Sequence, residues 1–154
     1  MKVLVVYDSK FGNTEKVAQA IATALGTGEG IRLAKVDTIT PQDATALDIL
    51  IVGSPIQAWR PTKAIKAFIN SLQPNVLSGV RAAAFDTGFR SWLSGSAAKK
   101  IEKALRRQGC LIVAPATKFL VAGTEGPLVE GELDKATAWA KQILETYETK
   151  SQNI

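Results

Sequence analysis

The chain has 154 residues, of which 46% are hydrophobic and 21% charged, so it has enough apolar material for one sizeable core. It contains one cysteine, Cys110, and no histidine, which excludes disulfides, cysteine-rich metal centres, Ser-His-Asp triads and His-ligated metals. The net charge is +5, and residues 60–118 concentrate it, with 11 basic and 2 acidic side chains. Any redox chemistry must therefore rely on carboxylates, hydroxyls, backbone donors or an organic cofactor, and no metal site is expected.

The first half of the chain alternates short apolar runs with amphipathic stretches. Residues 3–7 form an unbroken β-branched run, which predicts a strand buried on both faces. Apolar residues recur at helical spacing over 17–25, and the glycines that follow end this helix. The alternation over 31–36 is typical of a half-exposed strand near a sheet edge. Another buried strand is predicted over 49–52, followed by a helix that begins at Pro61.

The second half continues the same alternation. A strand is predicted over 80–85, and Ser96 can cap a helix that ends at Arg107. The fifth strand, over 110–114, is interrupted by Pro115, and a last amphipathic helix follows. A βαβ unit thus recurs about five times, which predicts an α/β fold with an open parallel sheet between two layers of helices. No linker or repeat is visible, so we expect a single domain over residues 1–154.

Three loops are expected to carry the function, because open parallel sheets bind ligands beyond the carboxyl ends of their strands. These loops cover residues 9–14, 53–61 and 86–95. In the first, Gly12 allows backbone N–H groups to turn inward at a helix N-terminus, as a phosphate requires. The loop matches neither the Walker A pattern nor G-x-G-x-x-G, and an ordinary helix cap is the alternative interpretation.

Aromatic side chains occur in the other two loops. Trp59 lies between two prolines in the second loop, and Phe89 and Trp92 lie in the third. Two aromatic rings facing each other across a slot could sandwich a flat heterocycle whose polar edge meets the loop backbone. For each tryptophan taken alone, the alternative interpretation is a partly buried side chain that packs against the protein rather than against a ligand.

The three loop sequences together resemble those of the flavodoxins. YDSKFGNTEKVA resembles their FMN-phosphate loop, GSPIQAWRP resembles the loop that covers one flavin face, and FDTGFRSW occupies the place of the second ring-contacting loop. The resemblance extends over nearly the whole chain, including GTEGPLVEGELDKA before the last helix. It implies a flavodoxin-like three-layer, doubly wound five-stranded sheet with strand order 2-1-3-4-5.

The resemblance also implies FMN as the cofactor and a set of residues that bind it. One aromatic stacking partner would be Trp59, and the other Trp92 or Phe89, because the family's usual Tyr after Gly-Asp is replaced here by Asp86-Thr87-Gly88. No catalytic residue is implied. The implied cofactor-binding residues are Ser9, Lys10, Phe11, Gly12, Asn13, Thr14, Pro55, Ile56, Gln57, Ala58, Trp59, Asp86, Thr87, Gly88 and Trp92.

The sequence departs from the family pattern in two ways. Many flavodoxins are acidic around the flavin, whereas Lys10, Arg60 and Arg90 lie in the three ligand loops here. Such cations would stabilise an anionic reduced flavin and raise its potential. In addition, no glycine occurs between Gly53 and Gly79, so a positive φ at Gln57 or Ala58 in the second loop would cost about 1 kcal/mol.

The leading functional hypothesis is an FMN-binding electron carrier rather than an enzyme with its own substrate. An FMN-dependent NAD(P)H:quinone oxidoreductase on the same fold is the alternative, although no dinucleotide motif or long insertion is visible. A phosphoacceptor receiver would need a carboxylate where this chain has Gly53-Ser54.

The basic middle third of the chain predicts redox partner proteins with an acidic docking surface, the alternative being a solvated cationic face. Nucleic-acid binding is not expected, because base-reading groups do not accompany the charges. No apolar run reaches the roughly 18 residues that span a bilayer, and MKVLVVYDSK lacks the features of a signal peptide, so a cytoplasmic protein is expected.

Overall fold

The computed structural model describes residues 1–90 and 96–152, the side chains of residues 150–152 excepted. The strands are β1 (Val3–Tyr7), β2 (Ile31–Lys35), β3 (Ile49–Pro55), β4 (Arg81–Gly88), β5 (Leu111–Ile112) and β6 (Thr117–Leu120). The α-helices are α1 (Asn13–Leu25), α2 (Lys63–Asn70), α3 (Ala97–Arg107) and α4 (Glu132–Gln152). Two short 3₁₀ helices, η1 (Val36–Thr38) and η2 (Pro41–Ala44), lie between β2 and β3.

The strands form one parallel sheet with the order β2-β1-β3-β4-β5, which confirms the predicted fold class. The fifth strand is divided, because Pro115 separates β5 from β6. Arg81 at the start of β4 pairs with Leu111 of β5, whereas Phe85 further along pairs with Thr117 of β6. The interruption expected at this proline is therefore present, and β4 changes its outer neighbour halfway along.

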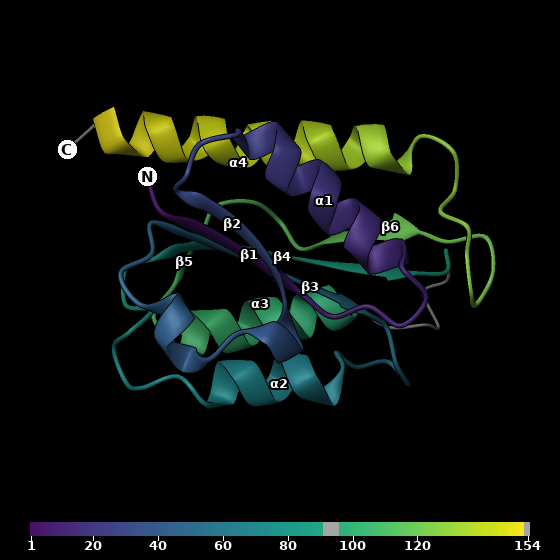
Figure 1. Cartoon of the computed structure of the whole chain (residues 1–154), viewed down its shortest axis with the longest axis horizontal. Helices are drawn as coiled ribbons and strands as arrows, with labels where there is room; N and C mark the ends of the chain where they lie inside the picture. The colour runs from purple at the N-terminus through teal and green to yellow at the C-terminus, as the bar shows by residue number, and fades with distance from the viewer. Residues whose placement is uncertain (91–95, 153–154) are drawn as a thin grey trace.

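Helices cover both faces of the sheet, as Figure 1 shows, with α1 and α4 on one side and α2 and α3 on the other. Each side has its own buried core. On the α1 and α4 side, Phe85, Phe119 and Trp139 form an edge-to-face triad with ring centroids 5.8–6.0 Å apart. Cys110 is buried on the opposite side, where burial raises the pKa of its thiol to about 11.

Two strands extend further than their apolar runs predicted. β3 continues through Pro55 and β4 through Gly88, with Ser54 opposite Asp86 and Pro55 opposite Thr87. Hydropathy marks where buried apolar side chains end, but backbone pairing continues past that point with polar side chains that are themselves buried. Parts of the second and third predicted loops are therefore strand, which holds them firmly in the sheet.

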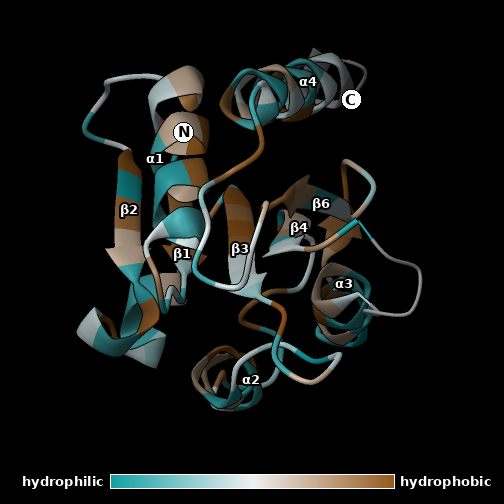
Figure 2. Ribbon diagram, turned by 90° about the vertical axis from the view of Figure 1, so that its right-hand side faces the viewer, coloured by the Kyte–Doolittle hydropathy of each residue, from teal (hydrophilic) through white to brown (hydrophobic). Residues whose placement is uncertain are grey.

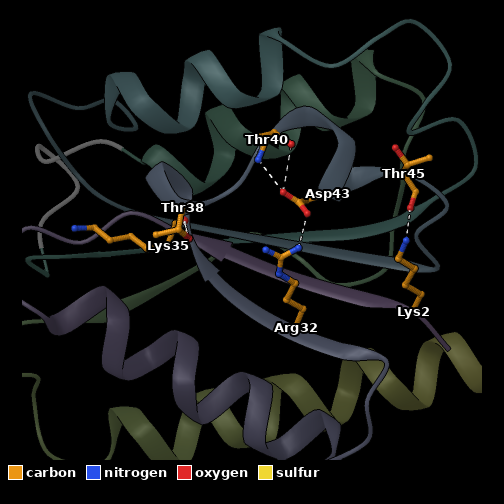
Figure 3. A network of polar contacts seen from close by, with 7 residues as sticks. All are labelled: Lys2, Arg32, Lys35, Thr38, Thr40, Asp43 and Thr45. Atoms are coloured by element: carbon orange, nitrogen blue, oxygen red, sulfur yellow. Dashed lines mark hydrogen bonds and ion pairs between the residues drawn. The ribbon is translucent and has the colours of Figure 1, made fainter.

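The segment between β2 and β3 was not predicted as regular structure. Figure 3 shows how polar contacts hold it to the sheet edge: Arg32 of β2 forms an ion pair with Asp43 of η2, and the Thr40 N–H donates to Asp43 at 2.8 Å. The bond from Thr40 and the Arg32 guanidinium together hold the pKa of Asp43 below its usual value. The Lys2 ammonium donates to the Thr45 carbonyl at 2.7 Å.

Within residues 1–90 and 96–152, no helix is long and apolar enough to cross a membrane. The same residues contain no group of three or more Cys, Asp or Glu side chains placed to hold a metal ion.

Candidate functional site

A cavity of about 410 Å³ opens at the carboxyl ends of the central strands. Figure 2 views the molecule from this end, with β1 and β3 between the two helix layers. The cavity volume lies in the range of sites that hold a small-molecule cofactor. It is lined by Ser9, Lys10, Phe11, Asn13, Thr14, Pro55, Ile56, Gln57, Thr87, Gly88, Phe89, Val121 and Thr124.

The loop between β1 and α1 forms one end of the cavity. Gly12 precedes the first turn of α1 with a φ of 90°, a left-handed conformation that favours glycine. The Ser9 hydroxyl accepts hydrogen bonds from the backbone N–H of Gly12 at 3.1 Å and of Glu15 at 3.4 Å. These bonds curl the loop around the N-terminus of the helix.

Other backbone N–H groups of this loop remain available for a ligand. In the part of the chain that the structure describes, the N–H groups of Lys10, Phe11, Asn13 and Thr14 donate to no protein acceptor. They lie at a helix N-terminus, where the helix dipole favours negative charge. The Lys10 ammonium, which lies 5.3 Å from the centre of the Phe11 ring, adds a positive charge. This is the donor set that a phosphate group requires.

Two side-chain bonds fix this end of the cavity to neighbouring elements. The hydroxyls of Thr14 and Thr87 are hydrogen-bonded at 2.8 Å, which joins the first turn of α1 to the end of β4. The Asn13 amide donates to the Glu125 carbonyl at 3.2 Å, in the loop that precedes α4. Both bonds connect residues far apart in the sequence, so the loop between β1 and α1 is held in place by the protein itself.

The segment after β3 forms a side wall of the cavity and contains a tight two-residue turn. The Ile56 N–H donates to the Thr87 carbonyl at 3.1 Å, which ties this segment to β4. Gln57 and Arg60 exchange backbone hydrogen bonds of 2.9 and 3.0 Å around Ala58 and Trp59. Those two central residues have φ values of 47° and 66°, as type I′ turns require. Neither is glycine, so the turn is strained by about 1 kcal/mol or more at each position.

Asp86 lies in β4 and is completely buried. One carboxylate oxygen accepts from the Ala98 N–H at 2.9 Å and from the Ser96 hydroxyl at 3.4 Å, which anchors the start of α3 to β4. Within the described ranges, the other oxygen, Oδ1, has no hydrogen-bond partner. Burial raises the pKa of this carboxyl, although the bonds from α3 and the nearby charge of Lys118 act in the opposite direction.

Ten of the fifteen residues predicted to bind the cofactor line this one cavity. Gly12, Ala58 and Asp86 support its walls without lining it, each in the backbone or anchoring role described above. Trp59 is 58% exposed and does not line the cavity. Trp92 lies outside the described residues. Phe89, considered as an alternative to Trp92, lines the cavity and is 44% exposed.

Sequence reasoning missed two residues of the cavity wall, Val121 and Thr124. Both follow β6, whose last residue Leu120 pairs with Gly88 of β4. This strand shares the carboxyl edge of the sheet with the three predicted loops. The signal that could have found them was the position of KFLVAG after Pro115, which indicates another strand that ends at the same edge.

The fold and site thus define a doubly wound α/β protein whose carboxyl-end cavity suits a phosphate-bearing ligand. Four N–H groups at a helix N-terminus point to this ligand, since none has an acceptor among the described residues. Comparison with known proteins agrees with this class. The sequence profile of the flavodoxin family, described as "Flavodoxin", matches residues 5–145. The chain belongs to the flavodoxin family, whose members bind FMN and carry electrons.

Individual relatives show the same likeness. A curated flavodoxin from Aquifex aeolicus (strain VF5) is 35% identical over 91 residues, which are 56% of this chain and 49% of that protein. The match thus spans about half the length of this relative. A flavodoxin from the domain Archaea has a TM-score of 0.78 at 22% identity, over 96% of this chain and 99% of that one. Oxidised flavodoxin 1 from Bacillus cereus has a TM-score of 0.81 at 19% identity, over 94% and 98% of the two chains.

Proposed function

We propose that this chain binds FMN in the carboxyl-end cavity and transfers electrons between redox partner proteins. The observation that carries the proposal is the cluster of N–H groups at residues 10, 11, 13 and 14, which have no acceptor within residues 1–90 and 96–152 and lie beside the Lys10 ammonium. They would hold the FMN phosphate by charge-assisted hydrogen bonds. When bound, the flavin would supply the electron chemistry, so no catalytic acid or base is needed.

The remaining walls of the cavity have groups suited to the flavin ring. Ile56 and Phe89 offer apolar surface, and Phe89 is our candidate for an aromatic contact on one ring face. The backbone groups of Gln57 are bonded to Arg60, so its side-chain amide is our candidate for the polar edge of the ring. Trp59 could reach the ring only if the strained turn at residues 58 and 59 changed conformation on binding.

The first experiment is the visible absorption spectrum of the purified protein, with the released chromophore identified by mass. Flavin bands and released FMN are the expected result. A colourless protein that fails to quench the fluorescence of added FMN would contradict the proposal. Oxidation of NAD(P)H by the FMN-loaded protein with a quinone acceptor would instead place it among the oxidoreductases.

A pair of glycine variants tests the phosphate loop itself. Gly12→Ala places a side chain at a φ of +90° where the added Cβ meets nothing within 4 Å, so the substitution acts through backbone strain alone. We expect it to weaken FMN binding about tenfold and riboflavin binding little, because only FMN has the phosphate. Gly79→Ala is the matched control, with a φ of +76°, an equally open Cβ position and no part in the cavity.

The partners are proposed to be proteins with an acidic docking surface, met in the cytoplasm. Support comes from the excess of 11 basic over 2 acidic residues in the segment 60–118. Opposite charges on two proteins accelerate their encounter, and the effect weakens with added salt. Electron transfer to an acidic acceptor protein is therefore expected to slow steeply as ionic strength rises.

A further inference from the structure

A second cavity, of about 680 Å³, lies between α2 and α3. We call it the α2/α3 groove. None of the described residues that line it is acidic. Its cationic lining residues are Arg60, Lys63, Lys66, Lys100, Lys103 and Arg107.

The cations form two facing rows. Lys63 and Lys66 are three residues apart on α2, and Lys100, Lys103 and Arg107 follow one face of α3 at intervals of three and four residues. All are exposed, and within the described part of the chain none forms an ion pair with a carboxylate. The groove therefore has a positive field that the protein itself does not neutralise.

The floor of the groove is apolar. Its accessible apolar residues are the half-buried Pro61 and Ala104. Beneath them lie Ile65, Ile69 and Ile101, which are almost fully buried. A ligand that fills the groove must therefore offer negative charge along both sides and apolar groups toward the floor. No aromatic side chain is among the described lining residues, so there is no surface on which a nucleotide base could stack.

The groove adjoins the proposed FMN cavity. Gln57 lines both, and the backbone between them is the strained turn of Ala58 and Trp59. The Lys100 ammonium donates to the Trp59 carbonyl at 2.8 Å, which connects α3 to that turn. A macromolecule seated in the groove would thus lie next to the wall of the cofactor cavity, as electron transfer between two proteins requires.

We propose that the α2/α3 groove docks an acidic segment of the partner protein, with carboxylates toward the two rows of cations and aliphatic side chains on the apolar floor at Pro61 and Ala104. This inference rests on the proposed electron-carrier function and adds the place and the chemistry of docking. Charge complementarity selects an acidic occupant, and the apolar floor selects a peptide over a nucleic acid, whose charged backbone offers no apolar group to it.

The test measures binding of a fluorescent peptide of four Glu-Glu-Leu repeats by anisotropy, using the FMN-loaded protein. The variant Lys66→Glu/Lys103→Glu reverses one charge on each side of the groove. The matched control Lys99→Glu/Arg106→Glu makes the same change in net charge at exposed positions of α3 that do not line the groove. FMN binding of every variant is measured separately by fluorescence quenching.

We expect the groove variant to weaken peptide binding about tenfold and the control variant by no more than about threefold. A peptide in which Ala replaces every Leu is expected to bind several-fold more weakly than the original. Equal losses in the two variants, or no peptide binding at all, would overturn the inference. Tighter binding of an oligonucleotide of the same charge, lost in the groove variant, would overturn it in favour of a nucleic acid.

The two proposals fail separately. If FMN binds and the peptide does not, only the docking inference is wrong. If the protein takes up no FMN, the electron-carrier function is wrong, and so is the docking role inferred from it, even where the FMN-free protein binds the peptide.

Discussion

The buried hydroxyls of Thr14 and Thr87 are hydrogen-bonded at 2.8 Å, across 73 positions of the sequence. The bond joins the first turn of α1, which follows the phosphate loop, to the part of β4 that lines the same cavity. A single hydrogen bond between two small side chains thus fixes the relative positions of two walls of the proposed FMN site.

Thr14→Val should lower the free energy of unfolding of the FMN-free protein by about 1 kcal/mol or more, because the Thr87 hydroxyl is left without its partner. Urea unfolding measures the change. Thr87→Val and the double variant complete a double-mutant cycle, in which the double variant should cost less than the sum of the single ones. Strictly additive costs would show that the two hydroxyls do not stabilise each other.

Ala58→Gly should raise the free energy of unfolding by about 1 kcal/mol, because glycine adopts the observed φ of 47° without strain. We also expect weaker FMN binding, since the turn beside the cavity becomes less rigid. Ala46→Gly is the control, with a φ of 58° at an exposed position that does not line the cavity. It should stabilise the protein equally and leave FMN binding unchanged. Loss of stability in Ala58→Gly would contradict the strain argument.

Asp86 should make the stability of the protein depend on pH. Because burial raises the pKa of its carboxyl in the folded state, the folded protein binds the proton more tightly than the unfolded chain does. The stability from this residue is therefore present below the unfolded pKa of about 4 and is lost as pH rises through the folded pKa.

Asp86→Asn removes this titration but retains an oxygen that can accept from the Ala98 N–H. The free energy of unfolding of the variant, relative to that of the original protein, should increase as pH rises from 4.5 to 7.5. Urea unfolding without FMN measures it. A stability difference that stays constant over this interval, or that changes in the opposite direction, would show that burial does not raise the pKa of the Asp86 carboxyl.

Lys10→Gln should lower the reduction potential of bound FMN, because the ammonium lines the cavity and favours the anionic reduced cofactor. The expected change is about 10 mV, the effect of one exposed charge on a two-electron couple. Arg90→Gln is the control, since Arg90 lines neither cavity and should have a smaller effect. Potentiometric titration measures the reduction potential of both variants. An equal shift in the two would contradict the larger effect expected of Lys10.

The parallel sheet could be predicted because buried parallel strands appear as continuous apolar runs, as in residues 3–7 and 49–52. The order of its strands came from the resemblance of the loops to those of the flavodoxins. The turn at Gly12 was equally visible, because glycine favours the left-handed φ that turns neighbouring N–H groups inward. Local patterns of this kind depend on neighbouring residues, which the sequence shows directly.

Features that depend on distant residues could not be predicted. Nothing near Thr14 indicates that its hydroxyl meets Thr87. The excess of basic residues was evident from composition, but its arrangement as two facing rows depends on how α2 packs beside α3. The exposed position of Trp59 follows from a turn conformation that alanine and tryptophan rarely adopt.

The division of the fifth strand also affects the tendency of the protein to aggregate through its sheet edges. An open sheet presents two outer strands whose unpaired backbone groups can recruit another chain. Here one outer edge consists of β5 and β6, only 2 and 4 residues long and separated by a stretch that contains Pro115. The other edge, β2, places the charged side chains of Arg32 and Lys35 within its five residues. Neither edge is a long, flat, apolar template, so the fold resists edge-to-edge aggregation at high protein concentration.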